Sequence, residues 1–175
     1  IFCAPPSTGK TTLARILVRA TGYPAAEFSA TVSGIGEIKK LMEKSLAARH
    51  ERGKPLVLFV DEIHHFNRSI QDAFLPYVER GDVILLGTTT ENPAYKINRA
   101  LLSRLKILEL FPLKNEHLAS ILGRALTFIR EHGGGDFGFT PEAEAVVIGY
   151  SHGDSRRLLN LVEIITTIDK EKVLT

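Results

Sequence analysis

The feature that most constrains the fold is a run of five apolar residues at 56–60 (LVLFV), which is followed at once by Asp61 and Glu62. A strand without polar positions has no face for solvent, and such strands are typical of parallel sheets that helices cover on both sides. The other predicted strands are residues 1–3, 26–29, 83–86 and 106–110. The chain is therefore expected to build a sheet around the 56–60 strand.

Between these strands, apolar residues recur at three- and four-residue intervals, which is the spacing of an amphipathic helix. The predicted helices are residues 11–20, 35 to about 53, and 69–79. In the first of them, Leu13, Ile16 and Leu17 recur at helix spacing. Strand and helix in alternation indicate an α/β fold with a parallel sheet.

Later in the chain the strands give way to helices alone. The predicted helices are residues 118–129, a segment that begins at 140–141, and residues 154–168. Thr140 followed by Pro141 is a good N-cap and first-turn pair, and residues 133–136 (GGGD) predict a flexible break. We predict two domains, residues 1–112 with the sheet and residues 113–175 as a small helical subdomain.

Composition excludes several classes of protein. Of the 175 residues, 44% are hydrophobic and 24% are charged, which is ordinary for a globular chain and unlike a disordered one. No run of about 18 apolar residues is present, so no membrane span is expected, and no secretory signal is visible. The single cysteine, Cys3, cannot form an internal disulfide. A formal net charge of +2 permits contact with nucleic acid without arguing for it. Because the sequence starts inside a predicted strand and ends without a stop signal, we expect it to be truncated at both ends.

Residues 4–11 (APPSTGKT) lie between a predicted strand and a predicted helix, the context that a phosphate-binding loop requires. Backbone N–H groups at a helix N-terminus point toward a bound phosphate, where the helix dipole favours negative charge. Lys10 would reach the β- and γ-phosphates, the Thr11 hydroxyl would bind Mg²⁺, and Gly9 would let the backbone approach closely. Ala4 departs from the usual first glycine of this motif, and Ser7 adds a side chain near the phosphates.

Two adjacent acids follow the 56–60 strand, and they suit two different roles in nucleotide hydrolysis. Asp61 would hold Mg²⁺, mostly through its waters, and Glu62 would orient and deprotonate the attacking water. The alternative is a pair of solvated acids at a strand end. Residues 88–90 (TTT) end a neighbouring strand in hydroxyls, which suit either the positioning of that water or ordinary capping.

Two arginines are candidates for delivering positive charge to the γ-phosphate, which strongly accelerates phosphoryl transfer. Arg104 precedes the last predicted strand, and Arg156 lies at the start of the last predicted helix. Each arginine taken alone is also consistent with an ordinary surface position. His64 and His65 are adjacent and do not share a helix face, so a metal site is not expected there.

In this order, the elements resemble those of an AAA+ ATPase: the phosphate loop, the Asp-Glu strand end, the threonine strand end, Ser-Arg and Gly-Asp-Ser-Arg. The more specific strings are residues 29–34 (SATVSG), 59–69 (FVDEIHHFNRS), 71–76 (QDAFLP) and 87–93 (GTTTENP). Together these strings resemble the replication-associated recombination protein A family. Its eukaryotic members are the Werner-helicase-interacting ATPases, which are related to clamp-loader subunits.

The resemblance implies an AAA+ (P-loop NTPase) fold, with a five-stranded parallel sheet flanked by helices and a small all-helical lid. It implies ATP and Mg²⁺ as cofactors. The residues that would bind nucleotide are Pro6, Ser7, Thr8, Gly9, Lys10, Thr11, Thr12 and Arg156. The residues that would hold the metal are Thr11 and Asp61.

The resemblance also implies an ATPase and assigns its catalytic residues. Glu62 would be the base and Thr90 the first sensor, with Thr89 as the fallback. Arg104 would insert into the site of a neighbouring subunit, and Arg156 would act from the lid as the second sensor.

Family resemblance further implies partners. These are DNA at forks, gaps or single-stranded/duplex junctions, and the single-stranded-DNA-binding protein. The chain would also bind copies of itself in a tetramer. No membrane partner is expected. The location would be the cytoplasm and nucleoid of a bacterium or the nucleus of a eukaryote. Full activity would require both the oligomer and DNA.

Three departures from the family remain. Members usually have glycine at positions 4 and 7 and arginine at position 65, and their C-terminal oligomerisation region has no counterpart here. Two alternatives stay open: a nucleotide-gated scaffold with little hydrolysis, which Ala4 and Ser7 motivate, and a subunit of a sliding-clamp loader.

Overall fold

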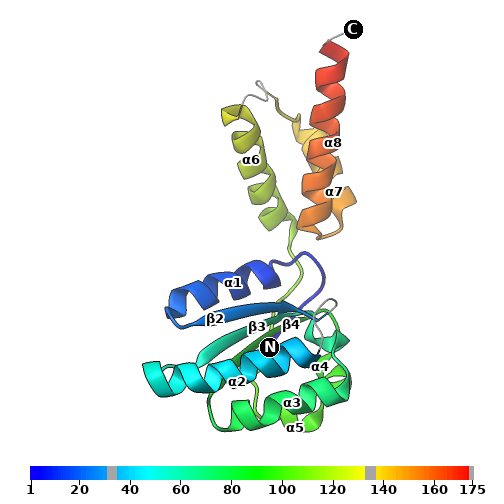
Figure 1. The fold of residues 1–175 in the computed structure, drawn as a ribbon. Coiled ribbons are helices and arrows are strands. Elements are labelled where there is room, and N and C mark those ends of the chain that lie inside the picture. Colours follow the sequence, from blue (N-terminus) through cyan, green and yellow to red (C-terminus); the bar gives the residue numbers. More distant parts are fainter. Residues whose placement is uncertain (31–34, 133–136, 174–175) are drawn as a thin grey trace. The chain divides into compact units, whose positions relative to one another are not determined.

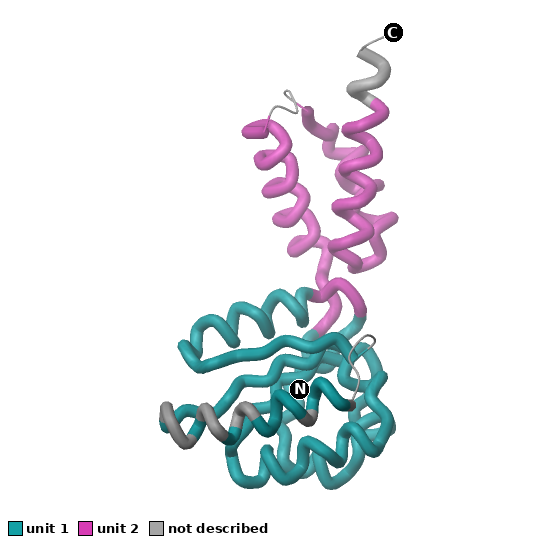
Figure 2. Tube along the Cα trace, in the orientation of Figure 1, with its two compact units in different colours: residues 1–5, 9–110 teal, residues 6–8, 111–175 magenta. Residues whose placement is uncertain are grey.

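The computed structural model describes residues 1–30, 35–132 and 137–173. The chain divides into two compact units (Figure 2), one formed by residues 1–5 and 9–110 and the other by residues 6–8 and 111–175. We call them the sheet unit and the helical unit. The expected break at residues 133–136 lies outside the described residues, as do residues 31–34 of the family strings.

The sheet unit is built on five parallel strands in the order β2-β3-β4-β1-β5. The strands are β1 (Phe2–Cys3), β2 (Ala25–Ser29), β3 (Leu56–Asp61), β4 (Val83–Thr89) and β5 (Leu108–Glu109). This confirms the predicted parallel α/β fold. The apolar run is β3, which pairs with β2 on one side and β4 on the other. Its residues 57–60 are at most 2% exposed, as expected for a strand covered on both faces.

Helices cover both faces of this sheet (Figure 1). The longer ones are α1 (Lys10–Thr21), α2 (Ile35–Arg52) and α3 (Arg68–Glu79), and the short ones are η1 (Ile63–His65), α4 (Pro93–Lys96) and α5 (Arg99–Leu102). In the figure α1 lies on one face, and α2, α3 and α5 lie on the other. Side chains of β3 alternate accordingly: Phe59 packs with Ala14 of α1, whereas Leu58 and Val60 pack with Ile38 of α2.

The predicted helix at residues 11–20 is confirmed as α1, but its large apolar side chains do not mark its buried face. Ile16 and Leu17 are 58% and 42% exposed, whereas Lys10 and Ala14 are buried. Residues four apart share a helix face, so the face toward the sheet follows Lys10, Ala14 and Val18. A buried lysine lies on that face, which a pattern of apolar residues alone could not reveal.

The helical unit contains α6 (Asn115–Glu131), α7 (Pro141–Ser151) and α8 (Ser155–Val173), and its described residues include no strand. Leu118 and Leu122 of α6 pack with Val147 of α7 and with Leu158 and Val162 of α8. The predicted start of the middle helix is confirmed, because the Thr140 hydroxyl accepts a hydrogen bond from the Ala143 N–H. Across the described helices of both units, none combines the length and apolar character needed to cross a membrane.

Candidate active site

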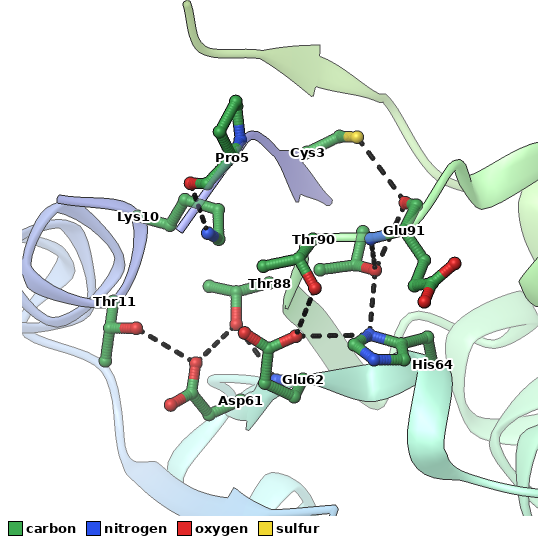
Figure 3. A network of polar contacts seen from close by, with 11 residues as sticks. Cys3, Pro5, Lys10, Thr11, Asp61, Glu62, His64, Thr88, Thr90 and Glu91 are labelled. Atoms are coloured by element: carbon green, nitrogen blue, oxygen red, sulfur yellow. Dashed lines mark hydrogen bonds and ion pairs between the residues drawn. The ribbon is translucent and has the colours of Figure 1, made fainter. Parts of the chain in front are cut away.

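The carboxyl ends of β3 and β4 bring together acids and hydroxyls. The two strands are in register with Val60 opposite Gly87, so the residues that follow, Asp61 and Thr88, are neighbours. Asp61 Oδ1 accepts hydrogen bonds from the Thr88 hydroxyl and, over 3.0 Å, from the Thr11 hydroxyl of α1 (Figure 3). Thr11 and Asp61, which are 50 residues apart in sequence, thus present adjacent oxygens.

Lys10 begins α1 and is 5% exposed. Its Nζ donates a 2.9 Å hydrogen bond to the Pro5 carbonyl, so the ammonium group is folded back onto the start of the loop. Gly9, the residue before it, has φ +89°, a left-handed conformation that favours glycine. The loop backbone at this point therefore requires the glycine of the GKT sequence.

Glu62 has an unusual backbone for a residue with a side chain, with φ +54°. Its N–H donates to the Thr88 hydroxyl over 3.0 Å, which supports this conformation. In the side chain of Glu62, Oε2 accepts a hydrogen bond from the Thr90 hydroxyl over 3.4 Å and lies 3.1 Å from Nδ1 of His64. The left-handed residue turns the chain out of β3 and directs the carboxylate toward the end of β4.

His64 holds the other side of this carboxylate, and its side chain is only 9% exposed. Nδ1 lies 2.9 Å from the Thr89 hydroxyl, which itself donates to the Glu91 carbonyl over 3.2 Å. Burial lowers the pKa of His64, against the opposing effect of the Glu62 carboxylate, so the imidazole is neutral at pH 7. Because a carboxylate only accepts, the tautomer that suits all these contacts carries its proton on Nδ1 and donates to both Glu62 and Thr89.

The contacts of Thr88 and His64 have no signal in the sequence. The string TTT at 88–90 contains no signal for which hydroxyl meets which acid. The register of β4 against β3 decides it: Thr88 reaches Asp61 and the Glu62 N–H, and Thr90 reaches the Glu62 carboxylate. His64 is placed by the short helix η1, which periodicity could not predict because it has three residues.

The two predicted arginines form hydrogen bonds and ion pairs with other residues. Arg104 pairs with Glu79 at 2.5 Å and donates to the Ala100 carbonyl over 2.7 Å, all within the sheet unit. Arg156 belongs to the helical unit, where its backbone N–H donates to Asp154 Oδ1 over 2.8 Å.

Residues 6–8 of the loop, with Ser7 and Thr8, group with the helical unit. Ser7 has φ +58°, and Ser155 at the start of α8 donates to its carbonyl over 2.7 Å. Burial acts to raise the pKa of Asp154, but hydrogen bonds from the Arg157 N–H, the Ser7 hydroxyl and the Arg156 N–H outweigh it and hold that pKa below its usual range. Hydrogen bonds thus support the left-handed backbone of Ser7. Ala4, the other departure from glycine in this loop, is not among the described residues with positive φ.

The oxygens of Thr11 and Asp61 fit a magnesium ion. Mg²⁺ prefers hard oxygen ligands and is usually held by one or two carboxylates together with phosphates and water. In the described part of the chain, no group of three His, Cys, Asp or Glu side chains could hold a metal alone. Thr11 and Asp61 supply two oxygens, and the phosphates of a nucleotide and water would supply the other ligands.

A parallel sheet with a glycine–lysine loop before α1 and acids at the end of β3 defines the P-loop class of nucleotide-binding proteins. Residues 1–113 match the model of the ATPase family associated with various cellular activities (AAA), and the chain belongs to that family.

Three relatives indicate which members of the AAA family the chain resembles. The chain is 40% identical over 165 residues to replication-associated recombination protein A of Escherichia coli K12 and 42% identical over 174 residues to that of Coxiella burnetii. These alignments cover 94% and 98% of this chain but only 37% and 39% of the relatives. ATPase WRNIP1 of Dictyostelium discoideum is 35% identical over 172 residues, covering 98% of this chain and 20% of that protein. The chain thus spans well under half the length of these relatives.

Among solved structures, the chain is similar to the RuvB Holliday junction branch migration motor of Thermotoga maritima. The TM-score is 0.72 at 25% sequence identity, over 97% of this chain and 55% of that one. The resemblance inferred from the sequence is therefore confirmed at the level of family and fold.

Proposed function

We propose that this chain is the ATP-binding and ATP-hydrolysing core of a DNA replication- and recombination-associated ATPase that acts at stalled or damaged forks. The observation that carries the proposal is the convergence of Thr11, Asp61 and Glu62 at the ends of α1 and β3, with Lys10 beside them. The names of the relatives support the setting in replication and recombination.

The residues around Asp61 would bind the nucleotide. Lys10 would leave the Pro5 carbonyl for the β- and γ-phosphates, and backbone N–H groups of residues 7–12 would surround them. Thr11 and Asp61 would hold Mg²⁺, directly or through water. The metal, when bound, supplies positive charge that offsets the negative charge of the phosphates.

Glu62 would act on the attacking water as the general base. Its carboxylate is held from two sides, by Thr90 and by His64, and 31% of the side chain is exposed. A held carboxylate at the open end of a strand can orient a water before it takes the proton. Thr90 would keep the role of first sensor.

The two arginines would complete the site. Arg104 would exchange its partner Glu79 for a nucleotide in a neighbouring subunit, and Arg156 would contact the nucleotide from the helical unit. Full activity would then require the homo-oligomer, which we expect to be a tetramer in the full-length protein. DNA at forks or gaps and the single-stranded-DNA-binding protein are the proposed partners.

The test of this assignment is Glu62→Gln in the full-length protein. Hydrolysis should fall by roughly a hundredfold or more because the general base is lost, while ATP binding measured by calorimetry is retained. Glu43→Gln, an exposed acid on α2, is the matched control. Unchanged turnover in Glu62→Gln would refute the assignment of the base.

A second candidate, a nucleotide-gated scaffold with little hydrolysis, is favoured by Ser7. Its side chain stands where related loops carry glycine, and its backbone is held by Ser155. A scaffold would show ATP-dependent association with DNA that survives Glu62→Gln and is lost in Lys10→Ala. Vigorous DNA-stimulated turnover in the wild type would rule it out.

A further inference from the structure

A groove on the sheet unit remains unexplained by the nucleotide site. It encloses about 440 Å³ and is lined by Arg68 at the start of α3 and by residues 94–99, which run from α4 into α5. We call it the basic groove. In Figure 1 its three elements lie side by side on the face of the sheet opposite α1.

The basic groove carries three cations and no acid in its lining. Arg68, Lys96 and Arg99 are all exposed, and none of them forms an ion pair with an acid in the described part of the chain. The carboxylate of Asp72, one turn after Arg68, accepts a 2.5 Å hydrogen bond from the Asn98 side chain instead. Three uncompensated positive charges around one hollow favour a negatively charged ligand.

An aromatic ring stands beside these charges. Tyr95 is 86% exposed, although the residue two positions on, Ile97, is only 3% exposed. The Tyr95 ring is almost wholly in solvent and has cationic residues near it in the sequence. Its faces are therefore available for another flat ring to stack on. Aromatic rings next to phosphate-binding cations are the combination that single-stranded nucleic acid requires.

Hydrogen bonds from one buried side chain hold the backbone of the groove in place. Gln71 of α3 is 1% exposed, and its side-chain amide donates to the carbonyls of Phe66 and Lys96 over 2.9 and 3.0 Å. Its carbonyl oxygen accepts from the Asn98 N–H over 2.7 Å. One buried side chain thus ties the segment before α3 to the segment between α4 and α5. A site whose backbone is already ordered binds its ligand at a lower entropic cost.

We propose that the basic groove binds single-stranded nucleic acid, with backbone phosphates at Arg68, Lys96 and Arg99 and a base stacked on Tyr95. The choice of a single strand follows from the ring, because the faces of bases in a duplex are covered by their neighbours. This inference rests on the DNA-associated role proposed above and adds the surface that makes the contact.

The test measures binding of the full-length protein to a fluorescein-labelled oligothymidine and to a blunt duplex of equal length, over a range of salt concentrations. The groove variant is Arg68→Gln/Lys96→Gln/Arg99→Gln. The control variant is Arg19→Gln/Lys54→Gln/Lys106→Gln, which removes the same charge from exposed positions outside the groove. Loss of three phosphate contacts should reduce the slope of log affinity against log salt by about 2 for the single strand. The control should keep the wild-type slope.

Variants of Tyr95 distinguish the contribution of base stacking to binding from the contribution of charge. Tyr95→Ala should weaken binding of the oligothymidine by about 5- to 100-fold, whereas Tyr95→Phe keeps the ring and should bind as the wild type does. Thermal unfolding of each variant checks that the fold is intact. Equal weakening of the duplex by Tyr95→Ala would overturn the preference for a single strand.

Three other outcomes would also overturn the proposal. If the groove variant and the control variant lose the same slope, the groove is not the contact surface. If the groove variant dissociates into subunits on a sizing column, the groove is an interface between copies of the chain. If the wild type binds neither DNA, the proposed role at DNA fails together with the groove, whereas failure of the groove alone leaves wild-type binding intact.

Discussion

Among single residues, Asp61 of β3 joins three elements of the site, because it contacts α1 on one side and β4 on the other. One of its oxygens accepts from two hydroxyls, Thr11 from the helix after the loop and Thr88 from the neighbouring strand. Thr88 also accepts from the Glu62 N–H, so one buried hydroxyl links both acids. The uncharged side chain of Thr88 therefore fixes the position of Asp61 relative to Glu62.

Thr88→Val keeps the shape of the side chain and removes the hydroxyl. We expect the free energy of unfolding to fall by about 1–3 kcal/mol, because the Glu62 N–H is left without its partner in a partly buried position. Denaturant unfolding monitored by circular dichroism measures the change. Thr88→Ser retains the hydroxyl and should recover most of the loss. Equal stability of the valine variant and the wild type would show that the hydroxyl contributes nothing.

His64→Leu removes the N–H that holds the Glu62 carboxylate. We expect kcat for ATP to fall by about 10- to 100-fold, since a misplaced catalytic group loses much of its effect, with KM for ATP within about twofold. His64→Asn offers an amide N–H at a similar place and should recover part of the activity. An increase in KM with kcat unchanged would instead assign His64 to nucleotide binding.

At the scale of elements, β3 was predictable because a strand buried on both faces is apolar throughout. The helices α4 and α5 were not predictable from periodicity, since each spans four residues and begins at an asparagine cap, Asn92 or Asn98. In α1 the large apolar residues do not mark the buried face, because Ile16 and Leu17 are exposed whereas Lys10 and Ala14 are buried. The adjacency of Thr11 and Asp61 followed from the motifs, but the contacts of His64 and Thr88 required the register of the strands.

The first turn of α8 depends on Asp154, whose carboxylate accepts from the N–H groups of Arg156 and Arg157. Asp154→Ala should cost about 0.5–2 kcal/mol of unfolding free energy at pH 7, the usual effect of losing an N-cap. Asp154→Asn keeps the acceptor oxygen and serves as the control. A melting temperature unchanged by the alanine variant would contradict this role.

The same group gives a pH dependence of known sign. The pKa of Asp154 is held below its usual range in the folded chain, so its charge stabilises the fold fully above about pH 4, the unfolded pKa. This stabilisation is lost as the pH falls through the lower, folded pKa. The difference in melting temperature between wild type and Asp154→Asn should therefore shrink between about pH 5 and pH 2. A difference that grows on acidification would contradict the sign.

For the whole molecule, Arg104 matters because its proposed target belongs to another copy of the chain. Within one chain it pairs with Glu79, and the two side chains are 39% and 48% exposed. Exposed pairs contribute about 0–1 kcal/mol, so this one is easily exchanged for a phosphate.

Mixing two inactive variants tests this arrangement. Arg104→Ala and Glu62→Gln should each abolish turnover in the full-length oligomer. After subunit exchange, about a quarter of the sites combine an intact Glu62 with an intact Arg104 from a neighbour, so activity should return. Glu79→Gln should leave stability within about 1 kcal/mol of the wild type. A mixture that stays inactive, although the subunits have exchanged, would place Arg104 outside the neighbouring site.

The pairing of Ser7 with Asp154 and Ser155 limits how this protein can be recombined with its relatives. Residues 6–8 lie within the sequence of the first domain, yet the carbonyl and the hydroxyl of Ser7 form hydrogen bonds with Ser155 and Asp154 at the start of α8. A chimera that takes its helices from another member of the family must therefore take this tripeptide from the same parent. An engineer who cuts at the obvious linear boundary would separate the serine from the groups that stabilise its left-handed backbone.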